Sequence, residues 1–134
     1  MASQIKFFAP TVLVVENTAG RGFRRCARVR RLIQAIRSLA AKMEVRTRLV
    51  SRREVQTAFA PSGASTKHQI AVAIAEQLPE LAGRVPPCRK PWMSEDERTN
   101  IFDAVALALA FFHLREKRRL AGHRRSRDDS DTRR

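Results

Sequence analysis

A predicted strand, a long helix and a second strand follow one another near the start of the chain, and this order constrains the fold most. Residues 11–15 form an unbroken run of β-branched and apolar residues, which is typical of a strand covered on both faces. Apolar residues then recur at helical spacing from Val29 to Met43. Residues 45–50 indicate a second, more exposed strand. A crossover of this kind predicts a parallel pair, and so an α/β fold with a short, mostly parallel sheet flanked by helices.

The remaining elements are predicted to be helices joined by loops. Pro10 ends a short helix that covers residues 5–9. Ser51 and Glu54 have capping-box spacing and begin a helix that reaches about Phe59. A longer helix is predicted over residues 66–81, followed by a proline-rich loop over residues 83–92.

A last helix is predicted to begin at a second capping box, formed by Ser94 and Glu97. From about Arg115 the sequence is highly charged and of low complexity, so we expect it to fray and then become disordered. The predicted organisation is therefore one domain over residues 1–115 and a basic tail over residues 116–134.

The charge of the chain indicates a polyanionic partner. Its 27 Lys and Arg residues outnumber 13 Asp and Glu residues, which gives a formal charge of +14. Lys and Arg gain affinity for nucleic acid by displacing counterions from phosphates, although a solvated basic surface or a ribosome-associated protein has the same composition. The longest apolar run, residues 104–112, is too short to span a membrane, and we expect a soluble, cytoplasmic protein. The arginines expected to contact DNA phosphates precede or begin the long helix: Arg21, Arg24, Arg25, Arg28 and Arg31.

Two acidic residues stand out from the surface and capping carboxylates. Glu16 ends the first predicted strand, and Asp103 interrupts an alanine-rich apolar helix. A buried lone carboxylate is costly, so Asp103 needs a metal, a cation or water, and Mg²⁺ takes oxygen ligands of this kind. Asn100 and Asp96, one and two helical turns earlier, are expected on the same helical face, and Asn100 could add an amide oxygen. The alternatives are a surface aspartate at Asp103, or one paired with an arginine.

These features occur in an order that resembles a known family. The segments "VLVVEN", "VRTRLVSRREVQTAFAPSGASTKHQIAVAIAEQL" and "NIFDAVALALAFF" resemble the RuvC-type Holliday-junction resolvases of the ribonuclease H-like superfamily. The resemblance covers roughly residues 5–112. It implies a partial ribonuclease H-like fold.

The resemblance also implies roles for individual residues. Glu16 and Asp103 would bind two Mg²⁺ ions, with Mn²⁺ as an alternative, and Asn100 replaces the first aspartate of a DxxD pair. Lys67 matches a lysine that the family uses near the scissile phosphate. The family's first-strand aspartate has no counterpart in the sequence, so we expect a domain that is incomplete at its N-terminus.

The preferred hypothesis is a Mg²⁺-dependent, structure-selective endodeoxyribonuclease that acts on branched DNA in recombination or repair. The resemblance implies a homodimer. The main alternative is a non-catalytic nucleic-acid-binding remnant of the same fold. A small ribosomal-type or RNA-binding protein would account for the charge but not for Asp103.

Overall fold

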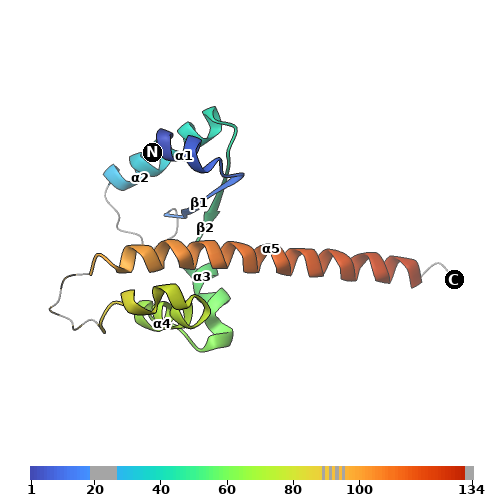
Figure 1. Cartoon of the computed structure of the whole chain (residues 1–134). Helices are drawn as coiled ribbons and strands as arrows, with labels where there is room; N and C mark the ends of the chain where they lie inside the picture. The colour runs from blue at the N-terminus through green and yellow to red at the C-terminus, as the bar shows by residue number, and fades with distance from the viewer. Residues whose placement is uncertain (19–26, 89, 91, 93, 95, 132–134) are drawn as a thin grey trace. The chain divides into compact units, whose positions relative to one another are not determined.

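The computed structural model describes residues 1–18, 27–88, 90, 92, 94 and 96–131, with side chains described as far as residue 121. The chain divides into two compact units, Met1–Arg53 and Glu54–Arg134. Figure 1 shows the elements of each unit along the colour bar. The first of these units contains the strands and the second contains the later helices.

The first unit contains the predicted strand, helix and strand. Its elements are α1 (Ala2–Phe8), β1 (Val12–Glu16), α2 (Ala27–Lys42) and β2 (Arg46–Val50). The two strands pair in parallel, with Val12 opposite Arg46 and Glu16 opposite Val50. This confirms the predicted parallel pair, and the described residues form a mixed helix and strand structure with a two-stranded sheet.

The end of α1 follows from the residue that comes after it. Ala9 adopts the left-handed conformation with φ of 41°, and its N–H donates to the carbonyl of Ile5 at 2.9 Å. Pro10 has no N–H and cannot continue the helical hydrogen-bond ladder. The predicted helix stop at this proline is therefore confirmed.

The turn from α2 into β2 closes with a pair of backbone hydrogen bonds. The N–H of Val45 donates to the carbonyl of Ala40 at 2.9 Å, and the N–H of Glu44 donates to the carbonyl of Ala41 at 3.1 Å. These bonds form a Schellman motif, which provides donors for carbonyls that have no hydrogen-bond partner within the helix. Glu44 occupies the left-handed position with φ of 58°, where glycine is normally preferred.

Burial in the first unit follows the predicted amphipathic pattern with two corrections. Ala40 and Val50 are completely buried, and most apolar positions of α2 are half-buried. Leu32, predicted on the apolar face, is 57% exposed. Every residue of β1 is half-buried, so this strand is not fully covered on both faces as predicted. Among the described residues, β1 pairs with one strand, β2.

The second unit is helical. It contains most of α3 (Arg52–Phe59), followed by the 3₁₀ turn η1 (Ala60–Ser62), α4 (Lys67–Gln77), the 3₁₀ turn η2 (Pro79–Arg84) and α5 (Thr99–Asp131). Helix α4 packs alongside the first half of α5 (Figure 1). Proline at residue 79 ends α4 earlier than the predicted residue 81, and the chain continues as η2.

The core of the second unit lies between α4 and α5. Ile74 is completely buried and Phe102 is 2% exposed. Burying side chains of this size contributes about 1.5–3 kcal/mol each to folding. The other buried members are mostly small, which lets the two helices approach closely; they include Ala71, Ala73, Ala75, Ala106 and Ile70.

Helix α5 differs from its prediction at both ends. It begins at Thr99 rather than at the Ser94 capping box. It also continues through Asp131, where the sequence indicated fraying after Arg115. Residues such as Arg, Lys, Glu, Leu and Ala favour helix, and extending an existing helix needs no new nucleation.

Candidate functional site

Two of the residues that the sequence singled out lie together in the second unit. The Nζ atom of Lys67, at the start of α4, lies 3.0 Å from Oδ2 of Asp103 on α5. The Lys67 side chain is 44% exposed and the Asp103 side chain is 50% exposed. This arrangement matches the alternative of a surface aspartate paired with a basic residue, although that residue is a lysine and not an arginine.

The exposure of Asp103 corrects its predicted environment. The buried face of α5 is formed by Phe102, Ala106 and Ala110, which recur every four residues. Asp103 and Ala104 lie outside that face and are exposed. Asp103 thus lies at the edge of the contact between α4 and α5, where water and ligands reach its carboxylate.

Asn100 lies one turn before Asp103 on the same helix. It is exposed, and its backbone N–H donates to the carbonyl of Glu97 at 3.1 Å. Residues three apart on a helix are neighbours on its surface. The amide of Asn100 and the carboxylate of Asp103 therefore lie on one accessible side of α5, as predicted.

The N-terminus of α4 is fixed by a capping box. The N–H of Gln69 donates to the Thr66 hydroxyl at 3.2 Å, and the N–H of Thr66 donates to Oε1 of Gln69 at 3.1 Å. Both orphan donors at the helix start are thereby satisfied. Since Lys67 is the first residue of α4, this cap determines where the Lys67 backbone lies.

Gln69 therefore has a structural role that the sequence interpretation missed. Its Oε1 also accepts from the N–H of Ser65 at 3.0 Å and from the Ser65 hydroxyl at 3.1 Å. The spacing Thr66-x-x-Gln69 is itself the capping-box pattern, so the signal was present in the sequence. The glutamine that formed part of the resemblance holds the helix start.

Glu16 belongs to the first unit. It is the last residue of β1 and is half-buried. The pairing continues one residue beyond it, because the N–H of Asn17 donates to the carbonyl of Val50 at 2.8 Å. Glu16 is therefore held at the carboxyl end of the parallel pair, the position predicted from the sequence.

The structure describes only part of the predicted phosphate-binding arginines. Arg28 and Arg31 lie on α2 and are exposed, so both can reach a polyanion. Arg21, Arg24 and Arg25 lie outside the described residues.

Asp96 forms the turn that leads into α5 instead of lying on the helix. Its Oδ1 accepts from the N–H of Arg98 and from Arg98 Nε, each at 2.9 Å, and its Oδ2 accepts from Arg98 Nη2 at 2.7 Å. These hydrogen bonds from Arg98 lower the pKa of the Asp96 carboxyl to about 2. The Asp96 carboxylate is thus engaged by a guanidinium, which removes it from the face shared by Asn100 and Asp103.

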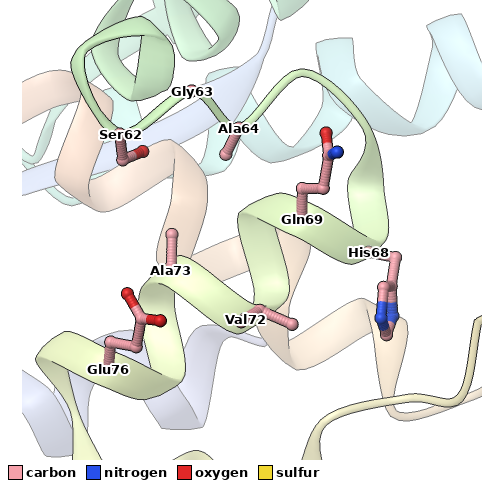
Figure 2. Close-up of a pocket in the computed structure, with 8 residues that line it drawn as sticks. All are labelled: Ser62, Gly63, Ala64, His68, Gln69, Val72, Ala73 and Glu76. Carbon is pink, nitrogen blue, oxygen red and sulfur yellow. The ribbon is translucent and has the colours of Figure 1, made fainter.

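A separate open cavity of about 250 Å³ lies beside α4. Figure 2 shows that its lining residues come from α4 and from the turn before it, and they include His68, Gln69 and Glu76. The residues singled out from the sequence, Lys67 among them, do not line it. The cavity therefore lies apart from the contact between Lys67 and Asp103.

The oxygen donors of the second unit suit a hydrated cation. Mg²⁺ keeps several waters and is usually held by one or two carboxylates together with substrate phosphates. Asp103 and Asn100 offer a carboxylate and an amide oxygen on one exposed side of α5. No group of three or more His, Cys, Asp or Glu residues suited to a metal is found in the part of the chain that the structure describes. Asp103 and Asn100 could therefore contribute two oxygen ligands to a cation that is otherwise bound by water or by substrate.

Within the described residues, no helix combines the length and the apolar character needed to cross a membrane. Comparison with protein-family models, curated proteins and solved structures finds no match to this chain.

Proposed function

We propose that the chain is a Mg²⁺-dependent, structure-selective endodeoxyribonuclease of the Holliday-junction resolvase type. It acts on branched DNA in recombination or repair, in the cytoplasm and as a homodimer. Its fold is a partial ribonuclease H-like fold, to which the parallel β1 and β2 contribute. The proposal rests on the resemblance of the sequence and on the geometry of the second unit.

One observation carries the proposal. Lys67 and Asp103 were assigned to phosphate and metal from separate segments of the sequence, and their charged atoms lie 3.0 Å apart. A lysine beside a metal-binding carboxylate is the arrangement that phosphodiester cleavage needs, because negative charge develops on the phosphate in the transition state. The accessible position of both side chains supports the same conclusion.

The metal-binding roles in cleavage would fall to the acidic and amide side chains. Asp103 and Asn100 would hold the cation on α5, and the resemblance implies a metal-binding role for Glu16 at the end of β1 as well. Bound Mg²⁺ would supply Lewis-acid activation of water and neutralise charge on the phosphate and the leaving oxygen.

Lys67 and the arginines act on the phosphates directly. An ammonium group has three N–H donors, so the contact of Lys67 with Asp103 is compatible with a contact to a phosphate oxygen. Arg28 and Arg31 would position the DNA through its backbone without reading sequence.

A non-catalytic nucleic-acid-binding protein is the second candidate, and Asn100 favours it. Asn100 stands where the resemblance implies an aspartate, so one negative charge for the cation is replaced by a neutral amide. A cation then has Asp103 as its charged ligand on α5, and that carboxylate already contacts the Lys67 ammonium. Both candidates predict DNA binding, and only the first predicts cleavage.

The deciding experiment is a nicking assay on a synthetic four-way junction with Mg²⁺. The endonuclease proposal predicts nicks near the crossover, and it predicts that Glu16→Gln and Asp103→Asn abolish nicking while junction binding persists. Glu80→Gln, on an exposed carboxylate of η2, is the matched control and should cleave normally. Binding without nicking by the unaltered protein would refute the endonuclease and support the second candidate.

Salt dependence tests binding separately from cleavage. A complex made through phosphate contacts loses affinity linearly on a double-logarithmic plot against salt, with a slope of about −0.9 for each phosphate neutralised on duplex DNA. Arg28→Gln and Arg31→Gln should each reduce that slope by about one unit. A junction affinity that does not change with salt would contradict the proposed mode of binding.

A further inference from the structure

The tryptophan of the chain is presented to solvent. Trp92 is the only tryptophan in the sequence and its side chain is 78% exposed. It lies in the connection between η2 and α5. Tryptophan combines a large apolar ring with one polar N–H, and it is enriched at binding interfaces.

A lysine supports the ring of Trp92. The Nζ atom of Lys90 lies 5.5 Å from the centroid of the Trp92 ring, within the range of a cation–π interaction. Contact with Lys90 covers one face of the indole, and the high exposure of the side chain leaves the opposite face accessible. The pair thus offers a flat aromatic surface backed by a positive charge.

The connection that carries Trp92 is anchored at both ends. Pro86 is buried, and its carbonyl accepts a hydrogen bond from Nδ1 of His68 on α4 at 3.1 Å. Val85 packs against the core of the second unit. At the other end, Thr99 is 8% exposed where α5 begins. The described residues that flank this connection are therefore held by the second unit, and binding residues commonly lie on such loops.

The charge of the chain indicates which class of molecule would bind at Trp92. A net charge of +14 favours nucleic acid. The carboxylate of Asp96, which follows in the same connection, is neutralised by hydrogen bonds from Arg98. Every nucleic-acid base has a π face that stacks on an aromatic ring.

We propose that Trp92, backed by Lys90, is a stacking platform for an unpaired base of bound DNA. Bases within a duplex are stacked on both sides, so only a base that has left the stack can offer a face to Trp92. The platform deepens the proposed function, on which it rests, because it gives the chain a means of preferring DNA that contains unpaired bases.

The test uses the fluorescence of Trp92 in the full chain. Because the sequence contains no other tryptophan and no tyrosine, the emission reports on this residue alone. Titration with a short oligothymidylate should quench the emission, and a blunt duplex of equal length should bind, by anisotropy of a labelled strand, without comparable quenching. Trp92→Ala should weaken oligothymidylate binding by about tenfold, the loss expected for one stacked base, and leave duplex binding unchanged.

Matched variants separate stacking from general effects. Trp92→Phe keeps a ring and should retain most of the single-strand affinity. Phe112→Ala removes another exposed aromatic side chain, on α5, and should bind oligothymidylate normally.

The outcomes also separate this inference from the proposed function. If the protein binds and nicks a junction but Trp92 emission is unchanged and Trp92→Ala binds oligothymidylate normally, the platform is refuted and the nuclease stands. If neither DNA form binds, both proposals fall. Emission that shifts on anionic lipid vesicles but not on DNA would refute the platform in favour of a membrane surface.

Discussion

The ammonium of Lys67 and the carboxylate of Asp103 form an ion pair at 3.0 Å although 36 positions separate them in the sequence. The pair joins the first residue of α4 to the exposed side of α5. Exposed ion pairs contribute about 0–1 kcal/mol to stability, so this pair holds the two helices together weakly. The pair therefore brings one positive and one negative group to the same exposed place without contributing much to the packing of the helices.

Lys67→Met should separate activity from stability. We expect junction nicking to fall by about 100-fold, because the charge that stabilises the developing phosphate charge is lost. The free energy of unfolding in urea should change by less than about 1 kcal/mol. Lys6→Met, on an exposed lysine of α1, is the control and should cleave normally. A destabilisation well beyond that range would show that the pair is structural.

Asn100→Asp should strengthen cation binding. The substitution adds the second carboxylate that the resemblance implies, one turn from Asp103. We expect about tenfold tighter Mn²⁺ binding by electron paramagnetic resonance, within the range measured for partners of metal ligands. Asn100→Ala is the matched control and should not tighten binding. Equal Mn²⁺ affinity in the aspartate and alanine variants would argue against a cation at this side of α5.

Asp96 should titrate well below an ordinary aspartate. Hydrogen bonds from Arg98 hold its pKa at about 2, against 3.8 for the unperturbed group. Because the pKa in the folded state is depressed, the stabilisation by this pair is fully present above pH 3.8 and is lost as the pH falls through about 2. Carbon-detected nuclear magnetic resonance should find this midpoint, and Arg98→Gln should move it upwards. An unchanged midpoint in that variant would contradict the assigned cause.

Thr66→Ala should destabilise the second unit. Loss of the hydroxyl leaves the N–H of Gln69 without its acceptor, which costs about 1 kcal/mol at a helix N-cap. Chemical denaturation followed by circular dichroism measures the change. Thr66→Ser keeps the hydroxyl and should unfold with the unaltered protein. If serine were as destabilising as alanine, the cap would not be the cause.

Glu44→Gly should stabilise the first unit. Glu44 has a φ of 58°, a conformation that costs a residue with a Cβ about 1 kcal/mol or more. Glycine adopts it freely but adds entropy to the unfolded chain, so we expect a net gain of up to about 1 kcal/mol in thermal unfolding. Glu44→Ala retains the Cβ and should show no such gain.

The sequence predicted the elements that depend on local periodicity. The apolar run before Glu16 and the spacing of α2 sufficed for the parallel pair, since a strand, helix and strand leave little choice of topology. The contact of Lys67 with Asp103 was not predicted, because residue order alone does not show which helices pack together.

The errors have identifiable physical causes. Ser94 with Glu97 and Thr66 with Gln69 have the same capping spacing, yet only the second pair begins a helix. Asp96 decides the difference, because its bonds to Arg98 form a turn just before Thr99. Periodicity also could not show that Asp103 lies beside the buried face of α5 rather than within it.

Helix α5 is continuous from Asp103 to the basic residues that follow it, so it fixes the distance between them. Arg119 lies about 24 Å beyond Asp103 along the axis, at about 1.5 Å per residue, and it is exposed together with Arg115, Lys117 and Arg118. That span is shorter than one turn of B-DNA, which is about 34 Å. A DNA arm gripped by this basic segment would present one particular phosphate to Asp103. Inserting a single residue between Asp103 and the basic segment would rotate that segment by about 100° relative to Asp103. The bound DNA would then shift, and so would the cleavage position.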